Sequence, residues 1–236
     1  MNTEAISDSR FGNKICLLND SFPPLIDGVA TTVLNYAAIL PHFGKQAVVA
    51  TPDYPGIKDQ YPFPVVRYPS FNTTKLVGYR AGYPFDPRSL TLLQKENCCL
   101  IHSHCPFVST YLARSLREIM EIPIVFTYHT KFDIDISKAV KSKVLRESSI
   151  KVLVDNIDAC DEVWTVSRGA ADNLRQLGYS GEIVQMENGV DFQKGKAPDA
   201  LCAAIRKEYA LPPDCFVLLY VGRMMWYKGI HIILDG

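Results

Sequence analysis

One stretch of the chain, residues 15–50, decides the fold: ICLLNDSFPPLIDGVATTVLNYAAILPHFGKQAVVA. It begins with the apolar run Ile15–Leu18 and crosses a polar loop that starts at Asn19. A helix-like segment, Val29–Leu40, follows the loop and leads to a second apolar run, Ala47–Ala50. Short, continuously apolar runs are typical of strands buried on both faces, and a helix between two of them is typical of a parallel sheet. We therefore predict that the stretch forms a βαβ unit.

The same alternation continues along most of the chain. The other predicted strands are Val65–Tyr68, Leu100–His102, Ile122–Thr127, Glu162–Val166 and Ile183–Met186. The other predicted helices are Pro87–Glu96, Val108–Met120, Ser137–Ile157 and Arg168–Leu177. This order predicts an α/β fold with a doubly wound parallel sheet of the Rossmann-like kind, whose ligands gather outside the carboxyl ends of the strands.

A second domain is predicted to begin at residue 198, which gives domains 1–197 and 198–236. Ala200–Tyr209 has the pattern of a helix, Phe216–Val221 that of a new buried strand, and Ile230–Leu234 that of a helix start. About 39 residues are too few to enclose an independent core. The second domain is therefore predicted to be an incomplete beginning of a Rossmann-like domain.

Composition narrows the class of partner. Lys plus Arg and Asp plus Glu number 25 each, so the chain has no net attraction to nucleic acid. Seven cysteines without a Cys-x-x-Cys pair indicate free thiols in a reducing compartment. The polar amino terminus does not have the pattern of a signal peptide, and no apolar run approaches the roughly 20 residues of a membrane span. A cytoplasmic protein is expected.

The loop after the first strand contains Asp27-Gly28-Val29, where the next helix is predicted to start. Free N–H groups at a helix amino terminus bind phosphate, and glycine lets a ligand approach the backbone. The alternative is a turn in which Gly28 adopts backbone angles that other residues avoid. The loop has neither of the two common glycine-rich nucleotide-binding patterns.

Three histidines follow predicted strands. His129, in Tyr128-His129-Thr130, lies at the carboxyl edge of the sheet, where it could donate a hydrogen bond or transfer a proton near neutral pH. The alternative is a hydrogen-bonded structural histidine, and the same holds for His102 and His104. Without a second ligand pair at a zinc-like spacing, no metal site is predicted.

The segment Val221–Gly229 places Arg223 and Lys228 between a predicted strand and a predicted helix start. Two cations near a helix amino terminus suit the negative charges of a diphosphate. The alternative is a pair of solvated cations on a surface turn. The strand-turn-helix context favours the diphosphate site.

Six segments in order resemble glycosyltransferase family 4, which has the two-domain GT-B fold. They are Phe22-Pro23-Pro24 with Asp27-Gly28-Val29, Ile101–Phe107, Tyr128-His129-Thr130, Val166-Ser167, Glu187–Asp191, and Val221-Gly222-Arg223 with Lys228-Gly229. The resemblance runs from about Lys14 to the last residue.

The resemblance implies a retaining hexosyltransferase that moves a sugar from a UDP- or GDP-linked donor to a hydroxyl acceptor, with no cofactor and no required metal. It implies an acceptor-side first domain and a donor-binding second domain. In the family's pattern, Gly28, Arg223 and Lys228 contact the donor diphosphate, and His129 lies near the transferred sugar as the catalytic candidate. The family's paired glutamates would follow residue 236, and Asp27 replaces a family glycine. The chain alone is therefore not expected to be active.

The segment after His129 is similar to members that glycosylate membrane lipids, such as diacylglycerol glucosyltransferases and phosphatidylinositol mannosyltransferases. The predicted helix Ser137–Ile157 carries cations beside apolar residues, as helices at anionic membrane surfaces do. The candidate membrane-contact residues are Lys138, Lys141, Lys143 and Arg146. This would place the protein at the inner face of the membrane as a peripheral protein of glycolipid synthesis. The alternative is a solvated helix face.

Two other functions compete with the transferase. One is a non-catalytic module derived from a GT-B enzyme that binds a sugar nucleotide or a protein. The other is a different GT-B enzyme, such as a nucleotide-sugar epimerase or a sugar-phosphate synthase.

Overall fold

The computed structural model describes residues 12–25, 27–74, 80–129, 132–189, 195–221 and 229–235. The chain divides into two compact units, residues 1–189 and 190–236. The domain boundary predicted after residue 197 stays a prediction. Each unit is described by itself below.

The first unit is built on a seven-stranded parallel sheet with the strand order β3-β2-β1-β6-β7-β8-β9. The strands are β1 (Lys14–Leu18), β2 (Gln46–Pro52), β3 (Val65–Tyr68), β6 (Cys98–Ser103), β7 (Ile124–Tyr128), β8 (Glu162–Thr165) and β9 (Val184–Gln185). The helices are α1 (Gly28–Ile39), the 3₁₀ helix η1 (Leu40–Phe43), α3 (Pro87–Lys95), α4 (Val108–Met120), α5 (Phe132–Ala139), α6 (Lys143–Asp158) and α7 (Arg168–Gln176). The predicted doubly wound α/β fold is confirmed.

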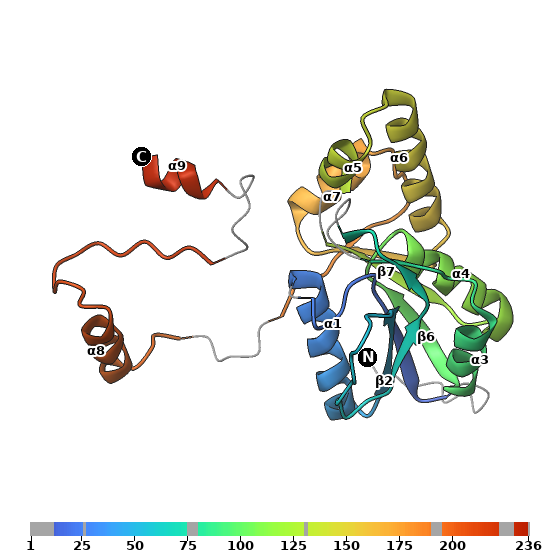
Figure 1. Cartoon of the computed structure of the whole chain (residues 1–236), viewed down its shortest axis with the longest axis horizontal. Coiled ribbons are helices and arrows are strands. Elements are labelled where there is room, and N and C mark those ends of the chain that lie inside the picture. The colour runs from blue at the N-terminus through green and yellow to red at the C-terminus, as the bar shows by residue number, and fades with distance from the viewer. Residues whose placement is uncertain are drawn as a thin grey trace, which may run out of the picture. The chain divides into compact units, whose positions relative to one another are not determined.

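Helices cover the central strands on both faces (Figure 1). Successive residues of β1 point to opposite faces. Leu17 packs with Val33 of α1 in one buried cluster, whereas Cys16 and Leu18 pack with Leu112 of α4 in another. Apolar groups on both faces explain why the strands are continuously apolar.

The strand order reverses between β1 and β6. The chain passes from β1 to β2 and β3 on one side, and β6 to β9 extend the sheet on the other side. Ligands of doubly wound folds bind at such a reversal point, outside the carboxyl ends of the strands, which here are β1 and β6.

Asp20, in the loop after β1, binds residues that follow β6 and so connects the two loops. Its carboxylate is buried and accepts hydrogen bonds from the backbone N–H groups of Val108, at 3.2 Å, and Ser109, at 2.7 Å. The Ser109 hydroxyl and the Cys105 thiol donate to it as well. The residue before α4, Phe107, caps nothing with its side chain, so the Asp20 carboxylate is the cap of α4.

Two features differ from the sequence prediction. The predicted helix Ser137–Ile157 is two helices, α5 and α6, and the chain between them is not helical. The Arg146 guanidinium donates to the Val140 carbonyl at this break, which satisfies an acceptor at the end of α5. The short hairpin β4 (Ser70–Phe71) and β5 (Ala81–Gly82) was not predicted, because two-residue strands leave no periodicity.

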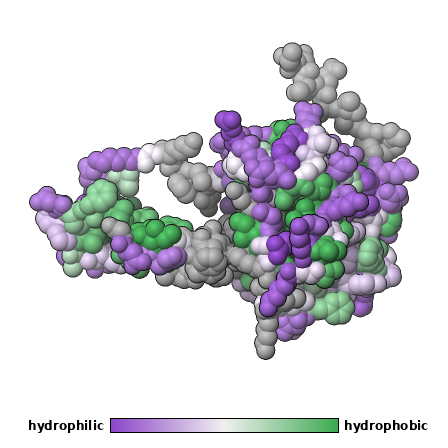
Figure 2. All heavy atoms as spheres, turned by 90° about the horizontal axis from the view of Figure 1, so that it is seen from above, coloured by the Kyte–Doolittle hydropathy of each residue, from purple (hydrophilic) through white to green (hydrophobic). Residues whose placement is uncertain are grey.

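The second unit contains α8 (Asp199–Glu208) and α9 (Ile230–Asp235). The strand predicted over Phe216–Val221 is not formed, which corrects the prediction. A strand needs a neighbour for its backbone hydrogen bonds, and the described part of this unit offers none. Phe216 and Leu219 are 89% and 85% exposed, and apolar surface is visible along this unit (Figure 2).

Replacing Asp20 by Asn should destabilise the first unit by about 1–3 kcal/mol. The site already contains four hydrogen-bond donors, and the NH₂ group of Asn would face some of them with donors of its own. Asp86 is the matched control. It caps α3 through Ser89, but it lies at the surface, where Asn caps a helix equally well. Urea unfolding of both variants measures the difference. Equal stability of the two variants would show that the buried cap does not hold the loops together.

Candidate active site

The carboxyl ends of four neighbouring strands meet at one edge of the sheet. Asn19 follows β1, His104 follows β6, His129 follows β7 and Val166 follows β8. Asn19 and His104 are buried, and His104 donates its backbone N–H to the Leu18 carbonyl at 2.9 Å. Backbone hydrogen bonding between β1 and β6 therefore continues into the loop after β6.

The amino terminus of α1 opens at this edge. The Asp27 carboxylate accepts the N–H groups of Val29 and Ala30 at 2.8 and 2.9 Å. The prediction that free N–H groups await a phosphate here therefore needs correction, since two of them already have an anionic partner. The Asp27 charge would also oppose a bound diphosphate, so the balancing cations have to come from elsewhere.

Gly28 is the first residue of α1 and does not have a positive φ. A Cβ atom built on it would meet nothing within 4 Å. The alternative of a turn glycine that needs unusual backbone angles is therefore wrong. Neither backbone strain nor packing requires glycine here, and the open space beside Gly28 would let a ligand approach the backbone closely.

Three histidine rings form a chain behind the edge. His102 Nε2 bonds the Thr127 hydroxyl at 2.7 Å, and His104 Nδ1 bonds His129 Nε2 at 2.8 Å. The ring centroids of His102 and His104 are 4.1 Å apart, and those of His104 and His129 are 5.1 Å apart. Tyr36 of α1 packs against His102 and His104. The predicted catalytic residue His129 is thus held by a buried neighbour.

Burial keeps these rings neutral. It lowers the pKa of His129 to about 4, although the Asp27 carboxylate acts in the opposite direction. It lowers the pKa of His102 to about 3, and it lowers the pKa of His104 well below its ordinary value. A His129 that stays neutral at pH 7 can donate or accept a hydrogen bond. The predicted alternative of proton transfer near neutral pH is not favoured.

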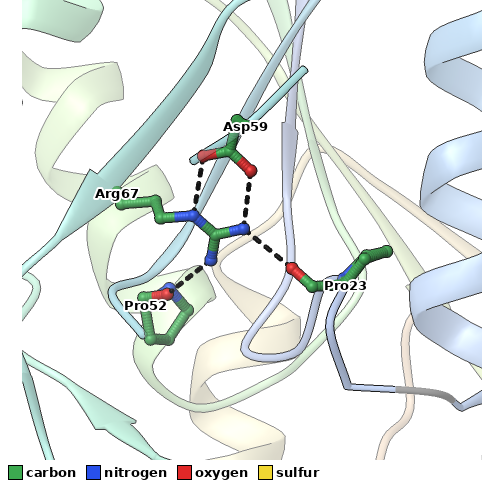
Figure 3. A network of polar contacts seen from close by, with 4 residues as sticks. All are labelled: Pro23, Pro52, Asp59 and Arg67. Carbon is green, nitrogen blue, oxygen red and sulfur yellow. Dashed lines mark hydrogen bonds and ion pairs between the residues drawn. The ribbon is translucent and has the colours of Figure 1, made fainter. Parts of the chain in front are cut away.

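Arg67 of β3 braces the loop after β1 (Figure 3). Its guanidinium forms two hydrogen bonds of 2.8 Å with Asp59 and donates to the carbonyls of Pro23, at 2.8 Å, and Pro52, at 3.2 Å. A shallow cavity of about 310 Å³ lies beside it, lined by Pro23, Pro24 and residues 57–61. These bonds connect the loop after β1 with the end of β2 and the segment before β3.

A cavity of about 360 Å³ lies at the opposite, amino edge of β8 and β9. Its lining includes Asp161, Glu162 and Glu182. Three carboxylates would repel a diphosphate, so this cavity does not compete with the carboxyl edge as a site for an anionic ligand.

Comparison with known proteins decides the family. The model of glycosyltransferase family 4 matches residues 26–194, which is well over half of the chain. The chain belongs to glycosyltransferase family 4. The match includes both Gly28 and His129, and it ends before Arg223 and Lys228.

Relatives of this family 4 chain are named as glycosyltransferases. It is 22% identical over 225 residues to an alpha-monoglucosyldiacylglycerol synthase of Streptococcus pneumoniae, covering 94% of the chain and 51% of that protein. It is 24% identical over 235 residues to the Acholeplasma laidlawii enzyme of the same name, covering 94% and 58%. It is 25% identical over 228 residues to a GDP-mannose-dependent alpha-mannosyltransferase of Corynebacterium glutamicum, covering 93% and 53%. The chain spans about half the length of these relatives.

A solved structure shares the fold. The catalytic domain of starch synthase IV from Arabidopsis thaliana, bound to ADP and acarbose, superposes with a TM-score of 0.54 at 14% identity. The match covers 95% of the family 4 chain and 65% of the plant domain.

The structure brings only some of the predicted site residues together. Gly28 and His129 lie at the same sheet edge, and the Asp27 charge acts on His129. Arg223 and Lys228 lie outside the described residues. Among the residues that the structure describes, no three His, Cys, Asp or Glu side chains form a metal-binding group, and no helix is long and apolar enough to cross a membrane.

The predicted membrane-contact residues fall into two kinds. Lys141 and Lys143 are exposed, and Lys143 lies 3.9 Å from Glu147 on the same helix. Arg146 instead turns toward the end of α5, with its Nε buried. The membrane contact of Arg146 stays a prediction, and its guanidinium also binds a carbonyl at the break between α5 and α6. The side chain of Lys138 lies outside the described residues.

Sequence reasoning missed the partners of Asp20 and His104. Asp20 bonds a residue 89 positions away, and His104 bonds one 25 positions away. The available signal was position, since both residues directly follow buried strands whose carboxyl ends meet. It indicated where the side chains gather but not which pairs form.

Adjacent substitutions at the start of α1 should change stability in opposite directions. Gly28→Ala should raise the free energy of unfolding by up to about 1 kcal/mol, since a methyl group has room and alanine favours helix. Asp27→Ala should lower it by about 1 kcal/mol, through loss of the cap. Urea unfolding checks both values. A destabilised Gly28→Ala variant would show that glycine is needed for the fold and not for a ligand.

Proposed function

We propose that the protein carrying this chain is a retaining glycosyltransferase, which moves a sugar from a UDP- or GDP-linked donor to a hydroxyl acceptor. One observation carries the proposal: the unfilled space at Gly28 lies at the same sheet edge as the neutral, anchored ring of His129. A backbone that a ligand can approach, next to a hydrogen-bonding ring, suits a sugar attached to a phosphate. The names of the family 4 relatives support the same reaction.

The start of α1 is an unfavourable place for the donor diphosphate. Asp27 makes the start of α1 less favourable for an anion, so we assign the two donor phosphates chiefly to Arg223 and Lys228. Arg supplies a planar fork of donors and Lys a compact charge, and together they balance about two negative charges. The sugar-diphosphate bond then breaks with its departing charge stabilised, and His129 hydrogen-bonds the sugar. The proposal includes no metal and no cofactor.

Replacing Arg223 or Lys228 by Ala should weaken nucleoside diphosphate binding about tenfold or more, because each removes a charge-assisted contact of about 1.5–3 kcal/mol. The measurement is calorimetry with UDP and GDP. It uses a hybrid protein, in which this chain is joined to the part of the Acholeplasma laidlawii synthase that the match does not cover. The chain alone should bind weakly and show no turnover.

The matched control is Lys45→Ala, which removes an exposed cation directly before β2, at the amino edge of the sheet. It should leave the affinity for nucleoside diphosphate unchanged. Unchanged affinity in both Arg223→Ala and Lys228→Ala would remove their phosphate role. A hybrid that binds diphosphates without transferring sugar would favour the binding-module alternative.

We further propose a lipid acceptor and contact with an anionic membrane surface. The support is the first turn of α6 and the segment before it, where Lys141 and Lys143 are exposed and the adjacent Val144 and Leu145 are 70% and 61% exposed. Cations next to exposed apolar side chains are the pattern of a helix that lies on anionic lipid. The glucosyldiacylglycerol synthases among the relatives point to the same acceptor class.

Changing Lys138, Lys141 and Lys143 to Glu should abolish binding to vesicles that contain phosphatidylglycerol, since each cation near the surface contributes about 1 kcal/mol. Co-sedimentation with anionic and neutral vesicles is the measurement, and added salt should mimic the variant.

The matched control changes Lys45, Lys95 and Lys207, all exposed and on other elements, to Glu. This control changes the net charge by the same amount as the Lys138, Lys141 and Lys143 variant. It should retain more binding to anionic vesicles than that variant. If the unchanged chain binds neutral and anionic vesicles equally, or neither, a soluble acceptor becomes the better proposal.

A further inference from the structure

In the pair formed by buried His104 and half-buried His129, one buried ring nitrogen has no hydrogen-bond partner within the described part of the chain. His104 is 1% exposed, and its Nδ1 bonds His129 Nε2 at 2.8 Å. Its other nitrogen, Nε2, is buried and finds no hydrogen-bond partner among the described residues. An unpaired buried polar atom in a native fold calls for an explanation. Here it restricts where the two protons of the pair can reside.

Two neutral imidazoles that share one hydrogen bond have two arrangements. If His129 Nε2 carries the proton, His104 accepts it on Nδ1 and must hold its own proton on Nε2. That arrangement buries an N–H group that has no acceptor. If His104 Nδ1 carries the proton, the unpaired atom is a bare nitrogen, which has no proton to donate. Orphaned N–H groups are rare in protein interiors, so the second arrangement is favoured.

We propose that His104 is a positioning residue that donates from Nδ1 to His129 Nε2, so that His129 keeps one ring orientation and presents its Nδ1–H to the ligand. The role of His129 rests on the proposed function, whereas the arrangement of the two protons does not. A fixed donor suits an oxygen of the bound sugar better than a ring that alternates between donor and acceptor, because preorganised dipoles need no rearrangement during the reaction.

The same hydrogen bond helps to keep His129 neutral. Donation to Nε2 stabilises the neutral ring, since a protonated Nε2 could not accept the bond. The titratable groups around the pair include Asp27, the cap of α1, whose charge favours protonation of His129. They also include His102 on β6, which disfavours protonation of His104, and Tyr36 on α1. Burial lowers the pKa of His129 and the Asp27 charge raises it. Loss of the His104 donor removes an interaction that favours the neutral ring, so the pKa of His129 should rise.

The direct test is long-range ¹⁵N NMR of the five histidine rings in the 236-residue chain. At pH 7, His129 should show a bare Nε2 and a protonated Nδ1, and His104 a protonated Nδ1 and a bare Nε2. In His104→Leu, the His129 titration midpoint should rise by about one pH unit, and its signals should show both tautomers. A protonated His129 Nε2 in the unchanged chain would overturn the inference.

Two variants separate positioning from a general structural role. His104→Asn places an amide N–H near the position of Nδ1 and should restore the single His129 tautomer. His102→Leu removes an equally buried ring that bonds Thr127 and not His129, so it should leave the His129 tautomer unchanged. If His104→Leu fails to fold, the unchanged chain and His104→Asn still decide the proton positions. Equal effects of His102→Leu and His104→Leu on His129 would contradict the inference.

Turnover by the hybrid connects the pair to the reaction. His104→Leu should lower kcat about tenfold to a hundredfold with little change in KM, and His104→Asn should recover most of the loss. An unchanged hybrid without turnover would count against the proposed function and leave the NMR result standing. An active hybrid in which His104→Leu leaves both kcat and the His129 titration unchanged would count against the positioning role alone.

Discussion

The Asp20 carboxylate is the contact on which the arrangement of the loops at the carboxyl edge depends. It sits in the loop after β1 and accepts four donors from the start of α4 and the residue after His104. Burial raises the pKa of Asp20, and the bonds from Ser109 and Cys105 offset this in part. A carboxylate so buried is tolerated only because its donors are in place. It therefore holds together the loops after β1 and β6, the two strands between which the strand order reverses.

The rest of the edge follows from this tie. With the loop after β1 held by Asp20 at one end and by Arg67 further along, α1 starts beside His129. Asp27 then occupies N–H groups that many nucleotide sites leave open for phosphate. This suits the proposed function, in which neutral groups at the edge contact the sugar and the charge of the diphosphate is assigned chiefly to Arg223 and Lys228.

The sequence predicted most of the scaffold and little of the pairing. Strand β3 and helix α4 were predicted with the bounds that the structure shows, because the pattern of apolar residues along the chain is a local signal. The cap of α4 was not predicted, because it comes from the distant Asp20. The break between α5 and α6 was missed, because residues 140–142 contain no glycine or proline that would indicate it. The strand over Phe216–Val221 was predicted from composition, yet strand formation depends on a neighbour that composition does not reveal. His104 was seen as a residue at the edge, but its bond to His129 required the sheet register.

The central claim is that a nucleotide sugar binds at the carboxyl edge, against Gly28 and His129. Backbone amide NMR of the chain, titrated with UDP-glucose and GDP-mannose at millimolar concentration, tests it most directly. One of the two donors should shift the amides of Gly28 and His129 most, and leave Glu162 and Glu182 at the opposite edge unmoved. Shifts centred on Glu162 and Glu182, or a hybrid that binds either donor without any change at Gly28, would contradict the claim.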